Sequence, residues 1–285
     1  MNHLLCFGFG FSAHTFVARL DKRAWKISAT SRDAEGIAEI NAQGFHGLPF
    51  DSTLQIAPDV THLLISAPPD EHGDPVLRLL LVQLQRLSKN LKWVGYLSTT
   101  GVYGDRGGDR VDEESPLEPT TARGQRRLEA EQSWLKLHSE FGLPVHLFRL
   151  AGIYGRGRNQ LLNVRDGSAK RIIKPGQIFS RIHVEDIAGV LAASIAKRNP
   201  GRAYNVCDDE PCPPQEVVEF AADLLGLTPP PQIPFEQANL SPMAKSFYAD
   251  SKRVSNKRIK AELSYKLLYP NYRDGLRALK STLTV

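Results

Sequence analysis

Apolar runs alternate with helical patterns along most of the chain before residue 200. The continuous apolar runs predict buried strands, and apolar residues at three- and four-residue spacing predict amphipathic helices. We therefore predict strands over residues 4–7, 25–30, 62–66, 93–98 and 145–150. Helices are predicted over residues 11–20, 34–42, 74–90, 125–141 and 186–197. Such alternation is typical of a parallel sheet with helices on both faces.

The pattern changes after Gly155, where glycines and basic residues dominate as far as Gly176. Beyond Asp208 we expect helices and loops, with a rigid proline-rich connector over residues 228–235. The fold class predicted is α/β, a doubly wound parallel sheet with a smaller C-terminal lobe. The larger domain is predicted at 1–155, with 178–206 returning to it, and the lobe at 156–177 and 207–285.

Composition narrows the class of protein. The chain has 285 residues, 41% of them hydrophobic and 24% charged, which suits a compact enzyme-sized fold. The net charge of +5 comes from scattered basic residues, so we expect no nucleic-acid partner. No run of about 18 apolar residues and no export signal are visible, so we expect a cytoplasmic protein without a membrane partner. Three cysteines without a C-x-x-C pair indicate reduced thiols and no metal site.

The segment FGFGFSA carries the sharpest chemical signal. Gly8, Gly10 and Ala13 form G-x-G-x-x-A between a predicted strand and a predicted helix. Gly8 permits a tight turn, Gly10 admits a pyrophosphate close to the backbone, and Ala13 lets the helix pack against the strand. The helix N-terminus offers N–H groups and a positive dipole to the phosphates. We assign the cofactor site to these residues together with Phe11, Ser12, Ser66 and Ala67. The motif predicts that the doubly wound sheet is Rossmann-type, that 1–155 is the nucleotide-binding domain and that the smaller C-terminal lobe is a substrate lobe.

The end of the second strand bears on the choice between NADP and NAD. An acidic residue there would bind the ribose hydroxyls of NAD, whereas this chain has Ser31 and Arg32. A hydroxyl and a guanidinium suit a 2′-phosphate, so we predict NADP. Asp33 keeps NAD as the alternative, because it could take the acidic role if the strand ended later.

Five segments extend the pattern along nearly the whole chain. In order they are FGFGFSA, LSTTGVYG, FRLAGIYG, SRIHVEDIA and YNVCDDEP. With them the chain resembles the extended short-chain dehydrogenase/reductases of the NAD(P)-dependent epimerase/dehydratase group, as an atypical member. The resemblance implies that Thr99 hydrogen-bonds a substrate oxygen. It also places Asp74 where the family has a water-ordering Asn, although a plain helix N-cap is an equal reading of Asp74.

The family's Tyr-x-x-x-Lys pair falls on Arg123 and Arg127. Arginine stays protonated at physiological pH, so Arg123 cannot exchange a proton as the tyrosine does. Arg127 could still hold the nicotinamide ribose, and Arg123 could meet a substrate carboxylate or phosphate. Both could equally be surface arginines. Thr100 and Gly101 replace the Asp-Glu pair of the family's sugar dehydratases, which makes water elimination the least expected chemistry.

Other residues are weaker candidates. Tyr103 and Tyr154 could supply the proton, or could simply pack in the core. His183 is more simply a core histidine, while Ser180 and Arg181 are better placed for a ligand. In the last helical region Arg253, Asn256 and Arg258 could meet an anion or lie on a solvated face, and Tyr248 has no assigned role.

The sequence thus predicts an NADP-dependent oxidoreductase or epimerase-like enzyme for an anionic or polar small molecule. The alternative is a non-catalytic NADP(H)-binding sensor or scaffold, since Arg123 and Arg127 replace the acid/base pair. The family also suggests a homodimer through helices 74–90 and 125–141. The leucines Leu77, Leu80, Leu81 and Leu84 would serve such an interface or a core face equally well.

Overall fold

The computed structural model describes residues 1–283 and divides them into two compact units. Unit 1 comprises residues 1–99, 125–149 and 187–204, and unit 2 comprises 100–124, 150–186 and 205–285. The segment 100–124, between the fifth strand and the long helix, therefore groups with the C-terminal residues. So do residues 178–186, which precede the returning helix.

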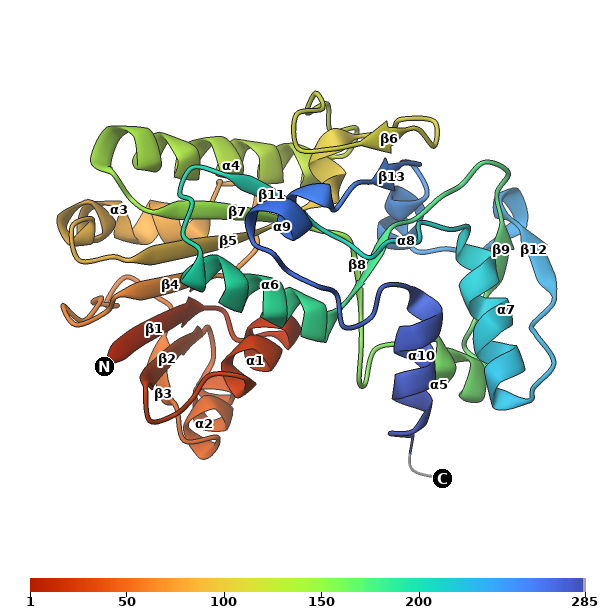
Figure 1. The fold of residues 1–285 in the computed structure, drawn as a ribbon, viewed down its shortest axis with the longest axis horizontal. Coiled ribbons are helices and arrows are strands. Elements are labelled where there is room, and N and C mark those ends of the chain that lie inside the picture. Colours follow the sequence, from red (N-terminus) through yellow and green to blue (C-terminus); the bar gives the residue numbers. More distant parts are fainter. Residues whose placement is uncertain (284–285) are drawn as a thin grey trace. The chain divides into compact units, whose positions relative to one another are not determined.

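A seven-stranded sheet is the framework of unit 1 (Figure 1). Its strands lie in the order β11-β7-β5-β4-β1-β2-β3. Strand β1 pairs in parallel with β2 and β4, β2 with β3, and β4 with β5. Chain order therefore reverses between β1 and β4, which is the topological switch point of a doubly wound sheet. The strands are β1 Asn2–Phe7, β2 Trp25–Ser31, β3 His46–Pro49, β4 His62–Ile65, β5 Trp93–Thr99, β7 Val145–Leu150 and β11 Ala203–Val206.

Helices cover both faces of this sheet (Figure 1). Apolar side chains of α3 and α4 pack on strand residues such as Phe7, Leu63 and Tyr96 to form the main core. On the other face, Trp93 packs against Phe16 of α1 and donates its indole N–H to Ser194 of α6. The helices are α1 Phe11–Ala18, α2 Ala34–Ala42, α3 Pro75–Leu87, α4 Ala122–Phe141 and α6 Val184–Ala196.

The predicted α/β class and parallel sheet are confirmed, and most elements agree with the prediction to within three residues. The strand β3 was not predicted, because HGLP has no apolar run and forms through pairing with β2. Of the four α3 leucines named in the sequence analysis, Leu80 and Leu84 are buried in the core and the half-buried Leu77 packs against it, whereas Leu81 is exposed. The core alternative therefore accounts for three of them.

Unit 2 is built from short strands and helices. Three small parallel pairs hold it together, β8 with β10, β9 with β12, and β6 with β13. The predicted proline-rich connector contains β12, so residues after 208 are not only helix and loop. The elements are η1 Thr100–Tyr103, β6 Arg110–Val111, β8 Gly152–Tyr154, α5 Gln160–Arg165, β9 Arg171–Ile173, β10 Arg181–His183, α7 Pro214–Leu225, β12 Gln232–Pro234, η2 Phe235–Gln237, α8 Pro242–Phe247, β13 Arg253–Val254, α9 Lys257–Glu262 and α10 Tyr272–Lys280.

Candidate functional site

The turn between β1 and α1 leaves space beside its backbone. Gly8 has a left-handed φ of +84°, and a Cβ there would lie 3.3 Å from the backbone nitrogen of Ala67. A Cβ built on Gly10 meets no atom within 4 Å. Gly10 is the N-cap of α1 and no side chain caps it. The first-turn N–H groups of an α-helix have no partner within the helix, so this turn suits an anion lying against the backbone.

The loop after β4 forms the second wall of this turn. The N–H groups of Ser66 and Ala67 both donate to the carbonyl of Phe7, at 2.9 and 2.8 Å. The N–H of Gly8 donates to the Thr30 hydroxyl at 3.0 Å, which fixes the turn from the β2 side. Of the other residues assigned here, Ser12 and Ala13 are buried and Phe11 is half-buried. The switch point thus brings together all the residues predicted for the diphosphate.

The carboxylate of Asp33 is engaged as a helix cap. Strand β2 ends at Ser31, and Asp33 is the N-cap of α2, accepting the Gly36 N–H at 2.7 Å. It also accepts a long hydrogen bond from the Ser31 hydroxyl at 3.4 Å. Arg32 stands between them with an exposed side chain. Oδ1 of the exposed Asp33 carboxylate therefore caps α2.

Thr99 and Arg127 lie at the carboxyl end of β5. Thr99 is the last residue of this strand and is half-buried. The guanidinium of Arg127 reaches back from α4, and its Nη1 donates to the Leu97 carbonyl at 2.6 Å and to the Tyr96 hydroxyl at 3.1 Å. Its central carbon lies 5.6 Å from the centre of the Tyr96 ring. Arg127 is therefore a half-buried cation attached to the strand that carries Thr99, not a purely solvated one.

Asp74 is the N-cap of α3. Its Oδ1 accepts the N–H groups of Val76 and Leu77 at 2.9 and 3.1 Å, and its Oδ2 accepts the indole N–H of Trp134 at 3.1 Å. Burial raises the pKa of this carboxyl, while these hydrogen bonds lower it. Both carboxylate oxygens of Asp74 thus accept hydrogen bonds within the fold, as a helix N-cap would.

A buried ion pair that the sequence analysis did not assign lies beside Ser98, the residue before Thr99. Glu131 of α4 and Arg149 at the end of β7 are both almost fully buried, with Nη2 and Oε2 2.8 Å apart. The hydroxyl of Ser98 donates to Glu131 Oε1 at 2.5 Å. The only sequence signal was an acid four residues after Arg127, which does not reveal a partner on β7. This network ties the ends of β5 and β7 to α4.

The two candidate tyrosines are buried in unit 2. The hydroxyl of Tyr103 donates to Asn205 Oδ1 at 2.7 Å. The hydroxyl of Tyr154 lies 3.5 Å from the Asn271 carbonyl, and its ring meets His183 edge-on. Burial raises the pKa of Tyr154 well above its usual value. Each phenol thus has a partner within unit 2.

His183 has the contacts of a core histidine. Its Nδ1 accepts the Glu185 N–H at 3.2 Å, and burial lowers its pKa to about 4. The remaining C-terminal candidates bond to their own unit. Ser180 accepts the Val254 N–H, Arg181 donates to the Phe179 carbonyl, Arg253 donates to the Gly108 carbonyl, Asn256 donates to Cys207, Arg258 pairs with Glu114, and Tyr248 packs on Phe179.

Arg123 is exposed near the start of α4. Its guanidinium carbon lies 5.2 Å from the ring centre of Phe247, the last residue of α8. Arg123 and Arg127 are one helical turn apart, yet each contacts a different aromatic side chain.

No helix within residues 1–283 combines the length and apolar character that crossing a membrane requires. Over the same residues, no group of three or more His, Cys, Asp and Glu side chains is arranged to hold a metal ion.

Comparison with known proteins places this geometry in a family. The model of the NAD dependent epimerase/dehydratase family matches residues 76–207. A solved protein of unknown function from Silicibacter pomeroyi DSS is 51% identical, with all of both chains covered and a TM-score of 0.93. Protein YeeZ of Escherichia coli K12 is 27% identical, over 95% of this chain and 97% of that protein.

More distant structures share the fold. Human epimerase family protein SDR39U1, solved with NADPH, is 18% identical over 99% of this chain and 100% of its own, with a TM-score of 0.78. Other solved structures of the same fold hold NAD. Residues 76–207 therefore carry a domain similar to the NAD dependent epimerase/dehydratase family, and the chain has the fold of the solved epimerases and dehydratases.

Proposed function

We propose that this protein is an NADP(H)-dependent oxidoreductase or epimerase-like enzyme that acts on an anionic or polar small molecule. The observation that carries the proposal is the space beside Gly10 at the switch point. The N–H groups at the start of α1 would hold the diphosphate, with Gly8, Ser66 and Ala67 shaping the turn. A bound nicotinamide cofactor supplies or accepts a hydride.

The end of β2 supports NADP rather than NAD. Asp33 accepts the Gly36 N–H as the cap of α2 and a long hydrogen bond from the Ser31 hydroxyl, while the exposed Arg32 beside it would meet a 2′-phosphate on the adenosine ribose. A guanidinium fork and a hydroxyl donate to a phosphate, whereas a carboxylate would repel it.

Thr99 and Arg127 are assigned to positioning in this enzyme. The Thr99 hydroxyl would donate to a substrate oxygen, and Arg127, attached to the end of β5, would donate to the nicotinamide ribose. The proton would come from Tyr103 or Tyr154, since Arg123 cannot give one up. Because both phenols are buried and their partners are amide oxygens, which do not carry protons, either would have to exchange its proton through water.

A non-catalytic NADP(H)-binding protein is the second candidate. The contacts of Arg127 with Leu97 and Tyr96, and of Asp74 with two N–H groups and Trp134, favour it. These side chains are engaged in holding the fold, while the glycine turn is left open.

Cofactor choice is tested by Arg32→Glu, with binding of NADPH and NADH measured by nicotinamide fluorescence. One charge-assisted hydrogen bond contributes about 1.5–3 kcal/mol, so NADPH affinity should fall about tenfold or more. NADH affinity should stay or rise. The control is Arg23→Glu, which reverses another exposed arginine of unit 1. Equal losses for both nucleotides would contradict the NADP assignment.

Catalysis is tested with NADPH and a panel of carbonyl compounds and nucleotide sugars, following absorbance at the nicotinamide band. The enzyme proposal expects turnover that Thr99→Ala abolishes and Thr99→Ser retains. Stabilisation by NADPH without turnover of any compound would instead support the binding protein.

A further inference from the structure

Gly36 lies where the first turn of α2 meets the end of β2. It is the third residue of this helix, and its N–H donates to Oδ1 of the N-cap Asp33 at 2.7 Å. A Cβ built on Gly36 would overlap the Ser31 hydroxyl oxygen and lie 2.9 Å from the Ser31 Cβ. Carbon atoms pack at about 3.5–4.0 Å from one another. The present Ser31 side chain therefore occupies the space that any side chain in place of the glycine would need.

The backbone of Ser31 is held on two sides. Its carbonyl accepts the Phe50 N–H at 2.8 Å, and Ser31 pairs with Pro49 at the end of β3. The hydroxyl of the preceding residue, Thr30, accepts the Gly8 N–H of the glycine turn at 3.0 Å. A backbone shift at this point would disturb both contacts. A side chain in place of the glycine would therefore be accommodated mainly by rotation of the Ser31 hydroxyl away from α2.

The Ser31 hydroxyl bears on the charge of Asp33. It donates to Asp33 Oδ1 at 3.4 Å, the same oxygen that accepts the Gly36 N–H. Both donors offset the negative charge of the carboxylate, and hydrogen bonds to charged groups are stronger than neutral ones. Asp33 directly follows Arg32, and both side chains are exposed. Rotation of the Ser31 hydroxyl would remove one donor and leave a more negative carboxylate beside Arg32.

We propose that Gly36 is a positioning residue that sets the preference of the proposed cofactor site for NADP(H) over NAD(H). It binds no ligand itself. Its missing side chain lets Ser31 stay against the first turn of α2, where the Ser31 hydroxyl offsets the charge of Asp33. A phosphate monoester carries about −1.5 to −2 charges at pH 7, so a carboxylate that lacks this donor would repel it. A ribose hydroxyl would instead donate to that carboxylate. The inference rests on the proposed function, in which Arg32 meets the 2′-phosphate.

The test is Gly36→Ala, with the dissociation constants of NADPH and NADH measured by titration of nicotinamide fluorescence. The readout is the ratio of the two constants, because a variant that is merely loosened loses affinity for both nucleotides alike. We expect NADPH affinity to fall about fivefold or more, while NADH affinity stays or rises. In competition titrations, 2′,5′-ADP and 5′-AMP should show the same shift, since they differ in the 2′-phosphate and lack the nicotinamide.

Ser31→Gly is the second variant, and it keeps Gly36. It removes the hydroxyl and the Cβ that a new methyl group at position 36 would meet. We expect it to shift the ratio in the same direction as Gly36→Ala. When Gly36→Ala is added to Ser31→Gly, the ratio should change by less than about twofold, because the donor is already absent and the two sites are coupled.

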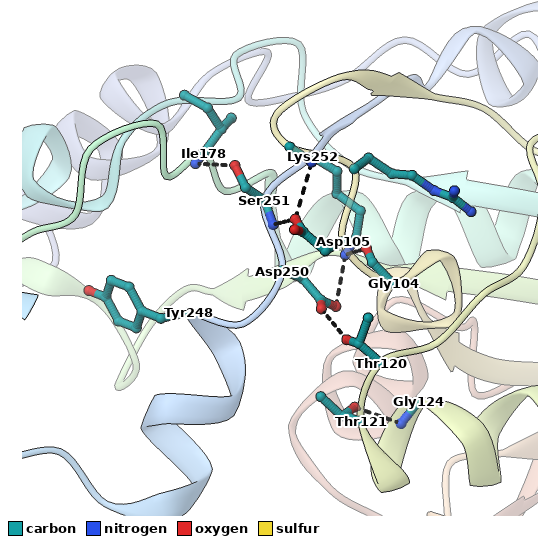
Figure 2. Close-up of polar contacts among 12 residues, drawn as sticks. Gly104, Asp105, Thr120, Thr121, Gly124, Ile178, Tyr248, Asp250, Ser251 and Lys252 are labelled. Atoms are coloured by element: carbon teal, nitrogen blue, oxygen red, sulfur yellow. Dashed lines mark hydrogen bonds and ion pairs between the residues drawn. The ribbon is translucent and has the colours of Figure 1, made fainter.

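Gly124→Ala is the matched control. Gly124 is also the third residue of its helix, α4, and its N–H donates to the Thr121 hydroxyl at 3.1 Å, as Figure 2 shows. A Cβ there would lie 2.8 Å from the Gly101 carbonyl oxygen. Gly124 belongs to unit 2, whereas Ser31 and Gly36 belong to unit 1. Gly124→Ala should lower the melting temperature and leave the ratio of the two dissociation constants unchanged.

The outcomes separate the inference from the proposed function. An unchanged ratio in a folded Gly36→Ala variant, or in Ser31→Gly, would overturn the inference, while a wild type that prefers NADPH would uphold the proposed function. An equal shift in Gly124→Ala would overturn the inference as well. A wild type that binds neither nucleotide, or binds NADH more tightly, would refute the proposed function and the inference together.

Discussion

Removing Arg149 from its buried pair tests how the end of β5 is held. Glu131 accepts hydrogen bonds from Arg149 Nε and Nη2 and from Ser98. In Arg149→Met the carboxylate keeps Ser98 but loses its cation while remaining buried. A stranded buried charge costs about 3–5 kcal/mol of unfolding free energy.

Equilibrium urea unfolding followed by tryptophan fluorescence measures this loss, because Trp25, Trp93 and Trp134 all lie in unit 1. Arg149→Met with Glu131→Leu removes both charges and should recover most of the loss. Arg126→Met, an exposed arginine on the same helix as Glu131, should stay within about 0.5 kcal/mol of the wild type. A deficit under about 1 kcal/mol at pH 7, or a double variant no more stable than Arg149→Met, would refute the reasoning.

Three further predictions concern the glycine turn, two buried histidines and the helix cap Asp74. Gly10→Ala should leave the melting temperature unchanged, because its Cβ has open space, yet weaken NADPH binding; Gly8→Ala should lower the melting temperature, because its φ is +84°. His146 and His183 have pKa values lowered to about 4 by burial, so they bind fewer protons folded than unfolded. The unfolding free energy should therefore fall as the pH is lowered from 6.5 to 4. Urea titrations at several pH values should show a smaller fall for His146→Gln than for the wild type. Asp74→Asn should keep the α3 cap and any turnover, whereas Asp74→Ala should cost about 0.5–2 kcal/mol; loss of turnover in the stable Asn variant would show that the charge is needed.

The sequence predicted the elements whose burial is local and continuous. Helix α2 and strand β7 have the predicted bounds, because an N-cap at Asp33 and the apolar run VHLFRL define them. Strand β3 and the short pairs of unit 2 escaped prediction, since each depends on a partner far along the chain. In β13, for example, Arg253 pairs with Arg110.

The sequence likewise predicted the roles of some residues of the candidate site and not of others. The glycine turn was readable because glycine and alanine are required by backbone geometry at fixed spacing. The roles of Asp33 and Asp74 could not be predicted from the sequence, because aspartate is both a good helix cap and a good acid. In the structure Asp33 accepts the Gly36 N–H of its own helix, and only Asp74 has a tertiary partner as well, the indole N–H of Trp134.

A phosphate site and an acid/base pair differ in how well they tolerate substitution during divergence. A phosphate site made from backbone N–H groups survives any change in the surrounding side chains that leaves the turn intact. An acid/base pair does not, because one substitution at the tyrosine position removes the proton. In this chain Arg127 contacts the carbonyl of Leu97 and the ring of Tyr96, and Arg123 contacts Phe247. Cofactor binding and proton transfer are therefore separable properties here, and each has to be measured by itself.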